Sequence, residues 1–303
     1  MITSSPSATS TPAASGLEEF RNLHRGERCF VVGCAPSLQQ LDLSHLRGEW
    51  AFTVNRGYLA ASLGLPQTQY HVVGDPHTYR AYWSEIREAS VGRRFYRANV
   101  IALPEYSGAP DHEAAICYPY HESPTMDEGH FAEDVTTGAY RGFTVVLDAV
   151  QIAFFMGFSE VYIIGCDLDY QGPQTHVYES GAYEQKRRND MPIPKVLQSM
   201  AVAAQAFRRH GRILANAGVG GCLDTIPRVE FASLFRSESK SPVTVESQET
   251  SCSPAPSATD LARQPRFLSF LLPYIDRGQG PLFHWVMLMQ AASFPPEIGR
   301  AHV

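Results

Sequence analysis

The chain has 303 residues, a formal net charge of −6 at pH 7 and a pI near 6.0. Hydrophobic residues make up 44% of it, which is enough for a sizeable folded core. A net negative charge offers no bulk attraction to a phosphate backbone, so no nucleic-acid partner is expected.

The N-terminal sequence, the apolar stretches and the cysteines indicate the cellular location to expect. Residues 1–16 are rich in Ser, Thr, Ala and Pro and lack the basic and apolar regions of a signal peptide, so we expect a disordered tail. No apolar stretch reaches the roughly 18 residues of a transmembrane helix. The run Val145–Phe158 is too short and contains Asp148. The six cysteines show no paired spacing, which favours reduced thiols and a cytoplasmic location.

Composition divides the rest of the chain into three stretches. Residues 17–236 are dense in alternating apolar segments and predict one α/β domain. Residues 237–264 are rich in Ser, Pro, Thr and Glu without an apolar period, which predicts a flexible linker. Residues 265–303 become apolar and aromatic again. Because residues 297–303 match the in-frame translation of a sequencing adapter followed by a stop codon, we expect 265–303 to be a truncated fragment of a longer natural protein.

Three short apolar runs in the first part of the α/β region predict buried strands. They cover Arg28–Val32, Trp50–Val54 and Tyr70–Val73. Each run is nearly continuous in apolar residues, as expected of strands covered on both faces, and polar residues follow each one closely.

Helices and strands alternate in the second part of the region. Apolar residues at helical spacing predict a helix over Thr144–Met156, with Gly157 ending it. A strand over Glu160–Ile164, a helix over Pro194–His210 and a strand over Arg212–Ala215 follow. This alternation predicts a Rossmann-like α/β fold with a doubly wound, mostly parallel sheet.

Ligands of such sheets bind beyond the carboxyl ends of the strands, so the residues that follow each strand are the candidate binding residues. Polar groups at several strand ends are expected to meet in one crevice. The candidates at these ends are Gly33, Cys34, Pro36, Ser37, Asn55, Asp75, Asp167 and Asp169.

The first strand-to-helix turn, Gly33–Leu38, has two interpretations. Pro36 and Ser37 can open a helical turn whose N–H groups face an anion, or the segment can be an ordinary connection. The glycine pattern is not G-x-G-x-x-G and no acidic residue follows at the dinucleotide position, so NAD is not the expected ligand.

Three blocks in order resemble a known bacterial family. Residues Gly26–Leu38, with 41–46 and 54–56, form the first block, Ala153–Asp167 the second and Asn216–Arg228 the third. They resemble the MptE-like family, named for an archaeal 6-hydroxymethylpterin diphosphokinase, and the related bacterial lipooligosaccharide sialyltransferases, which open with a similar Gly-Asn-Gly-Pro-Ser-Leu turn.

The resemblance implies roles for particular residues. Gly33 and Ser37 would lie at the nucleotide, Asp167 would match the Asp of a Gly-x-Asp motif, and Tyr170 would lie near a tyrosine that assists the departing phosphate. The positions that would line the donor site are Asn55, Asp75 and Thr144. The chain departs from the sialyltransferase pattern where Cys34-Ala35 replaces Asn-Gly, Asp75 replaces Asn and Val145-Val146 replaces Ser-Gly.

The resemblance leaves three functions open. The first is glycosyl transfer from a nucleotide sugar, for example a CMP-linked sialic acid, to a glycan or lipid-linked acceptor in surface-polysaccharide synthesis, in the cytoplasm or at the periphery of the inner membrane and without an obligatory cofactor. The second is pterin diphosphokinase chemistry with ATP and with Mg²⁺ held by Asp167 and Asp169. The third is a non-catalytic nucleotide-binding module.

A loop rich in Tyr and His follows the strand at Glu160–Ile164 and supplies the candidate catalytic residues. A neutral imidazole suits deprotonation of an acceptor hydroxyl, so His176 is the candidate base and His77 the second candidate. Tyr170 or Tyr178 would stabilise the leaving phosphate. A surface-loop histidine without a catalytic role is the alternative for His176.

Two further segments have open interpretations. The cluster Lys186–Arg188 either neutralises phosphate or is an exposed charge run. Gly218–Gly221 either cradles a ligand through backbone N–H groups or forms a tight turn.

Overall fold

The computed structural model describes residues 16–106, 115–121, 130–170, 174–181, 185 and 191–236. These residues belong to one unit, Met1–Glu238. The predicted tail up to residue 15, the linker at 237–264, the fragment at 265–303 and the cluster Lys186–Arg188 lie outside the described residues.

Seven strands of the described residues form one parallel sheet in the order β5-β4-β3-β2-β1-β8-β9. The strands are β1 (Arg28–Val32), β2 (Trp50–Val54), β3 (Tyr70–Val73), β4 (Arg93–Arg97), β5 (Ile116–Tyr118), β8 (Glu160–Ile164) and β9 (Ile213–Asn216). A second sheet pairs β6 (Tyr120–His121) with β7 (Ala139–Tyr140). The chain adds strands to one side of β1 and then returns to add β8 and β9 on the other, so the sheet is doubly wound.

The core strands form because nearly every side chain in them is buried. In β1 the residues from Cys29 to Val32 have no exposed surface, and β8 is equally buried from Val161 to Ile164 apart from slight exposure of Tyr162. Continuous apolar burial of this kind requires helices on both faces of the sheet.

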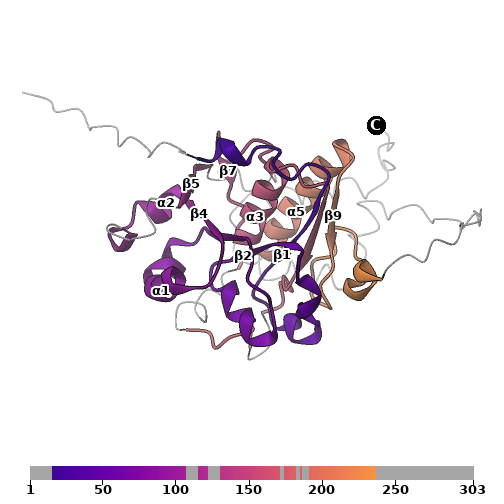
Figure 1. The fold of residues 1–303 in the computed structure, drawn as a ribbon, viewed down its shortest axis with the longest axis horizontal. Coiled ribbons are helices and arrows are strands. Elements are labelled where there is room, and N and C mark those ends of the chain that lie inside the picture. Colours follow the sequence, from indigo (N-terminus) through magenta and orange to yellow (C-terminus); the bar gives the residue numbers. More distant parts are fainter. Residues whose placement is uncertain are drawn as a thin grey trace, which may run out of the picture. The chain divides into compact units, whose positions relative to one another are not determined.

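Two long helices cover one face. They are α3 (Val145–Phe155) and α5 (Ile193–Arg209), which lie side by side (Figure 1). All eleven residues of α3 are buried, so this helix is the centre of the larger apolar cluster. The sharp end of α3 comes at Gly157, whose φ of 92° belongs to the left-handed region.

The other face is covered by α1 (Pro76–Glu88), α2 (Ala98–Ile101) and several 3₁₀ helices. The 3₁₀ helices are η1 (Glu18–Phe20), η2 (Pro36–Gln40), η3 (Leu43–Leu46), η4 (Gly57–Leu63), η5 (Pro104–Tyr106) and η7 (Phe231–Phe235), and all of them except η1 pack on this face. η2 and η3 lie in the connection from β1 to β2, and η4 lies in the connection from β2 to β3.

The predicted α/β fold with a doubly wound parallel sheet is confirmed. Four predicted strands have the observed bounds, and β9 lies one residue further along the chain than expected. The sequence did not predict α1, β4 or β5. Within the described residues, no helix has both the length and the apolar character to span a bilayer.

Candidate functional site

The strand order reverses at β1, which has β2 on one side and β8 on the other. The segments that follow β1 and β8 therefore leave the sheet toward opposite faces, and a crevice opens at the carboxyl ends between them. A cleft of about 270 Å³ lies there. Residues that follow β1, β2, β3 and β8 all line it, as expected from the sequence, together with residues at the end of β4 and at the start of α3.

The cleft brings together most of the candidate residues. Those that line it are Cys34, Asn55, Asp75, Thr144, Asp167, Asp169, Tyr170, His176 and Tyr178, together with the second candidate base, His77. Gly33, Pro36 and Ser37 are not among the residues that form its wall. The roles assigned to all these residues at a ligand stay predictions.

The first turn is closed by a carboxylate rather than open to a ligand. Asp167 accepts a hydrogen bond from the Ser37 backbone N–H at 3.1 Å and a second, short one from the Ser37 hydroxyl. Ser37 is only 3% exposed. Burial raises the pKa of Asp167, and the hydrogen bonds from Ser37 oppose that rise. The N-terminus of η2 thus already holds an anion supplied by the chain itself.

Gly33 is required by the close approach of two strands. A Cβ at this position would lie 2.1 Å from the carbonyl oxygen of Gly165, beyond the end of β8. The backbone ladder continues here, since Gly33 donates to Ile164 at 2.8 Å and Ala35 donates to Gly165 at 2.9 Å. The glycine therefore serves strand packing.

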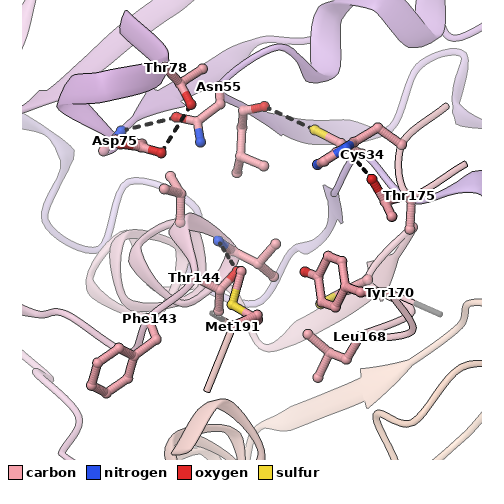
Figure 2. Close-up of a pocket in the computed structure, with 18 of the residues that line it drawn as sticks. Cys34, Asn55, Asp75, Thr78, Phe143, Thr144, Leu168, Tyr170, Thr175 and Met191 are labelled. Carbon is pink, nitrogen blue, oxygen red and sulfur yellow. Dashed lines mark hydrogen bonds between the residues drawn. The ribbon is translucent and has the colours of Figure 1, made fainter. Parts of the chain in front are cut away.

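Asn55 and Asp75 hold the strand ends on the other side of the cleft. Asn55 Oδ1 accepts from the Gly74 N–H at 3.4 Å. Asp75 caps α1 and accepts from the His77 N–H and the Thr78 hydroxyl, both at 3.0 Å. Figure 2 shows Asn55, Asp75 and Thr78 together on one side of the cleft, with Tyr170 across from them.

A buried arginine that the sequence did not single out forms part of the wall. Arg97 ends β4, is 4% exposed and pairs with Asp148 of α3 at 2.9 Å. The Tyr118 hydroxyl donates to the same carboxylate at 2.6 Å. Burial raises the pKa of Asp148, and the Arg97 charge opposes the rise. The only sequence signal for this residue was its place directly after the apolar pair Phe95-Tyr96.

The segment before α3 adds a second arginine and an aromatic ring. Arg141 and Phe143 both line the cleft. The Arg141 N–H donates to the His121 carbonyl at 3.1 Å, and Thr144 caps α3 by accepting from the Val146 N–H at 3.3 Å. Both ends of this short segment are therefore fixed.

Backbone strain is concentrated around the cleft. Non-glycine residues with positive φ in the described chain are Asn22, Asn55, Phe143 and Leu168, and all but Asn22 line the cleft. The φ values of Phe143 and Leu168 are 60° and 53°, which is uncommon for bulky side chains. Such strain persists where the surrounding structure holds it, and it is typical of functional sites.

The segment 174–181 carries the candidate base. The Val177 N–H donates to the Cys34 carbonyl at 2.7 Å, which ties the segment to the end of β1. His176 Nδ1 lies 2.8 Å from the Ser180 hydroxyl. The His176 ring stacks on Tyr178 with ring centres 5.1 Å apart and planes 15° apart.

The cysteines at the cleft are free thiols, as are the others that the structure describes. Cys34 donates to the Val54 carbonyl at 3.5 Å. Burial, with a contribution from the Asp167 charge, raises the pKa of Cys166 to about 12. A thiol that stays protonated near pH 7 is a poor nucleophile.

The glycine-rich segment after β9 forms a tight turn. The Arg228 guanidinium donates to the carbonyls of Gly220 at 2.7 Å and Gly221 at 3.1 Å. The Cys222 N–H donates to the Asp167 carbonyl at 2.7 Å, so the turn also supports the end of β8. Within the described ranges, no group of three or more His, Cys, Asp or Glu side chains is placed to hold a metal ion.

Comparisons with known proteins give few matches. No family model and no curated protein matches the sequence. Among solved structures, the protein is similar to the MAf glycosyltransferase from Magnetospirillum magneticum AMB-1, with a TM-score of 0.45 and 14% sequence identity. The similarity covers 72% of this chain and 38% of that chain.

Proposed function

We propose that the protein is a glycosyltransferase that binds a nucleotide-activated sugar in the cleft at the end of β1 and β8. The observation that carries the proposal is the set of residues that line this cleft. Two arginines and the N-terminus of α3 line the same cleft as His176 and Tyr170. Phosphate recognition and proton transfer are the two tasks that transfer from a nucleotide sugar requires. A CMP-linked sialic acid is the first donor to test.

The side of the cleft around α3 is suited to the phosphate of the donor. Arg97 and Arg141 provide guanidinium donors, which match phosphate oxygens in pairs. Val145 and Val146, the first two residues of α3, also line the cleft, so the positive end of this helix dipole faces the same space. Asp148 holds Arg97 in place, so the guanidinium is oriented before any ligand arrives.

Proton transfer is assigned to the segment after β8. His176 would accept the proton of the acceptor hydroxyl, and its contact with Ser180 holds one side of the ring. Tyr170 or Tyr178 would donate a hydrogen bond to the departing phosphate. His77, at the start of α1, is the second candidate base.

Diphosphokinase chemistry is the second candidate function, favoured by two carboxylates after one strand. Asp167 and Asp169 both line the cleft. Mg²⁺ in phosphoryl-transfer sites needs only one or two carboxylates besides the substrate phosphates. Since Asp167 is engaged by Ser37, Asp169 would be the main protein ligand. The proposed glycosyl transfer needs no obligatory metal, so a magnesium requirement separates the two functions.

Thermal-shift measurements with CMP, UDP, GDP and ATP, each with and without Mg²⁺, test the proposal. Stabilisation by CMP or another sugar-carrying nucleotide without metal supports it, and a requirement for both ATP and Mg²⁺ supports the diphosphokinase. Binding without turnover on any acceptor supports a non-catalytic module. Arg141→Met should weaken nucleotide binding about tenfold. Its control is Arg80→Met, which removes an exposed arginine on α1 that pairs with Glu105 instead.

Kinetics with an active donor then test the assigned roles. His176→Ala should lower kcat by about 10²–10⁴-fold with little change in donor affinity. Asn55→Ala should weaken donor binding. An unchanged kcat in His176→Ala would eliminate His176 as the base and move that role to His77.

A further inference from the structure

Arg56, directly after Asn55, is enclosed between two tyrosine rings. Its residue is 8% exposed, and its guanidinium carbon lies 3.7 Å from the centre of the Tyr82 ring and 4.5 Å from the centre of the Tyr178 ring. Tyr82 belongs to α1, whereas Tyr178 belongs to the segment after β8. One planar cation therefore bridges two parts of the chain that are far apart in sequence.

The backbone departs from regular geometry where this arrangement needs it. Asn55 has a φ of 46°, and the next residue is Arg56. Within α1, Tyr82 has φ −134° and ψ 24°, so the helix is kinked at the residue whose ring covers the guanidinium. Glu85, three residues further along α1, accepts from Arg56 at 3.2 Å and from the Tyr58 hydroxyl at 3.3 Å.

The contact continues from Tyr178 to the candidate base. The Tyr178 ring stacks on His176, so contacts run from Tyr82 through Arg56 and Tyr178 to the imidazole. Val177 lies between His176 and Tyr178 in the sequence, and its backbone N–H donates to the Cys34 carbonyl. This bond ties the backbone to the end of β1. The side chains on either side of Val177 have their own contacts: His176 with Thr175, Ser180 and Tyr178, and Tyr178 with Arg56.

We propose that Arg56 is a positioning residue that sets the orientation of Tyr178 and, through it, of His176 over the cleft. The inference rests on the proposed function, because it gives His176 a proton-transfer role. Arg56 does not line the cleft in the described structure, so its effect on the reaction is carried by the rings.

Steady-state kinetics test the effect on the reaction. Arg56→Met should lower kcat about 10–100-fold with the donor KM changed less than about twofold, because a misplaced base slows the chemical step without weakening donor contacts. Arg56→Lys keeps the charge beside Glu85 but lacks the planar group, so kcat should fall to an intermediate value. The control is Arg87→Met, which removes another arginine–aromatic contact, over Trp83 of α1, and should leave kcat unchanged.

Hydrogen exchange of the protein without ligand tests the positioning independently of activity. Peptides covering 174–178 should exchange about tenfold faster in Arg56→Met than in the natural protein, while peptides of β1 and β8 stay unchanged. An unchanged rate at 174–178, a loss of protection across the whole sheet, or a changed KM with unchanged kcat would each overturn the inference. If no donor supports transfer by the natural protein, the proposed function fails, and the exchange result still decides whether Arg56 holds this segment.

Discussion

The turn after β1 and the turn before α3 contain similar parts and both border the cleft, but only in the second do the first residues of the helix line it. Each has a buried glycine and a hydroxyl residue at the start of a helix: Gly33 and Ser37 in the first, Gly142 and Thr144 in the second. In the first turn, Asp167 fills the helix N-terminus from 130 positions away. In the second, Thr144 caps the helix and still lines the cleft. A local motif therefore indicates an N-terminus able to bind an anion but not whether the chain already provides that anion.

The two glycines offer the sharpest way to measure this difference. A Cβ at Gly33 would lie 2.1 Å from a backbone oxygen, that of Gly165, whereas a Cβ at Gly142 would lie 2.1 Å from the Cδ2 end of the flexible Leu147 side chain. Gly33→Ala should lower the free energy of unfolding by about 4 kcal/mol, and Gly142→Ala by about 1–2 kcal/mol. Urea denaturation measures both. Equal losses would show that the first turn is no more tightly packed than the second.

The unfolding free energies of these variants have to be compared at one pH, because the buried residue His71 makes stability depend on pH. Burial, reinforced by the Arg94 charge, lowers the pKa of His71 to about 3. The unfolded chain takes up a proton at this residue below about pH 6.5, whereas the folded chain stays neutral until about pH 3. Stability is therefore full above pH 6.5 and declines as the pH falls toward 3. Between pH 7 and 5 the loss should be about 2 kcal/mol.

His71→Gln is the matched variant for this pH effect. An amide does not titrate, so the difference in unfolding free energy between pH 7 and pH 5 should shrink by about 2 kcal/mol in the variant. Denaturation at both pH values measures it. The same pH dependence in both proteins would mean that His71 is not the group responsible.

Asp167→Asn tests directly whether the first turn is occupied by structure or by ligand. The amide keeps one acceptor for Ser37 but loses the charge, so the free energy of unfolding should fall by about 1–2 kcal/mol. Nucleotide affinity should change less than in Arg141→Met, measured by calorimetry. Ser37→Ala removes only the hydrogen bond from the hydroxyl, leaves the one from the backbone N–H, and is the control for that loss. Complete loss of nucleotide binding in a stably folded Asp167→Asn would instead place the ligand at the first turn.

The sequence predicted the central strands of the sheet well because they are largely apolar on both faces. The four strands β1, β2, β3 and β8 have the expected bounds. β4 was missed because Arg93, Arg94 and Arg97 give it the composition of a loop. Arg97 can be buried there only because Asp148, 51 positions away, neutralises it. Pairings of this length leave no periodic signal in a single sequence.

The same reasoning explains which site residues were predicted. Asn55, Asp75 and Asp167 were found because the carboxyl ends of parallel strands meet at one edge. Arg141 and Phe143 were missed because they precede a helix rather than follow a predicted strand. Arg56 was not singled out beyond its place in the block 54–56, since its two tyrosine partners come from separate segments.

Removing the cap of the second turn should have the smallest effect. Thr144→Ala leaves the Val146 N–H without its side-chain acceptor, which should lower the free energy of unfolding by about 1 kcal/mol. Because the freed N–H group lies at the cleft, nucleotide affinity should stay the same or rise, whereas a direct contact between the Thr144 hydroxyl and the ligand requires affinity to fall. Thr144→Ser keeps the hydroxyl and should restore both quantities. Asp42→Ala removes a cap on η3, whose residues do not line the cleft, and should leave affinity unchanged. Suppose instead that nucleotide affinity falls in Thr144→Ala and is normal in Thr144→Ser. The second turn would then bind its ligand through the Thr144 hydroxyl and not through the helix N-terminus.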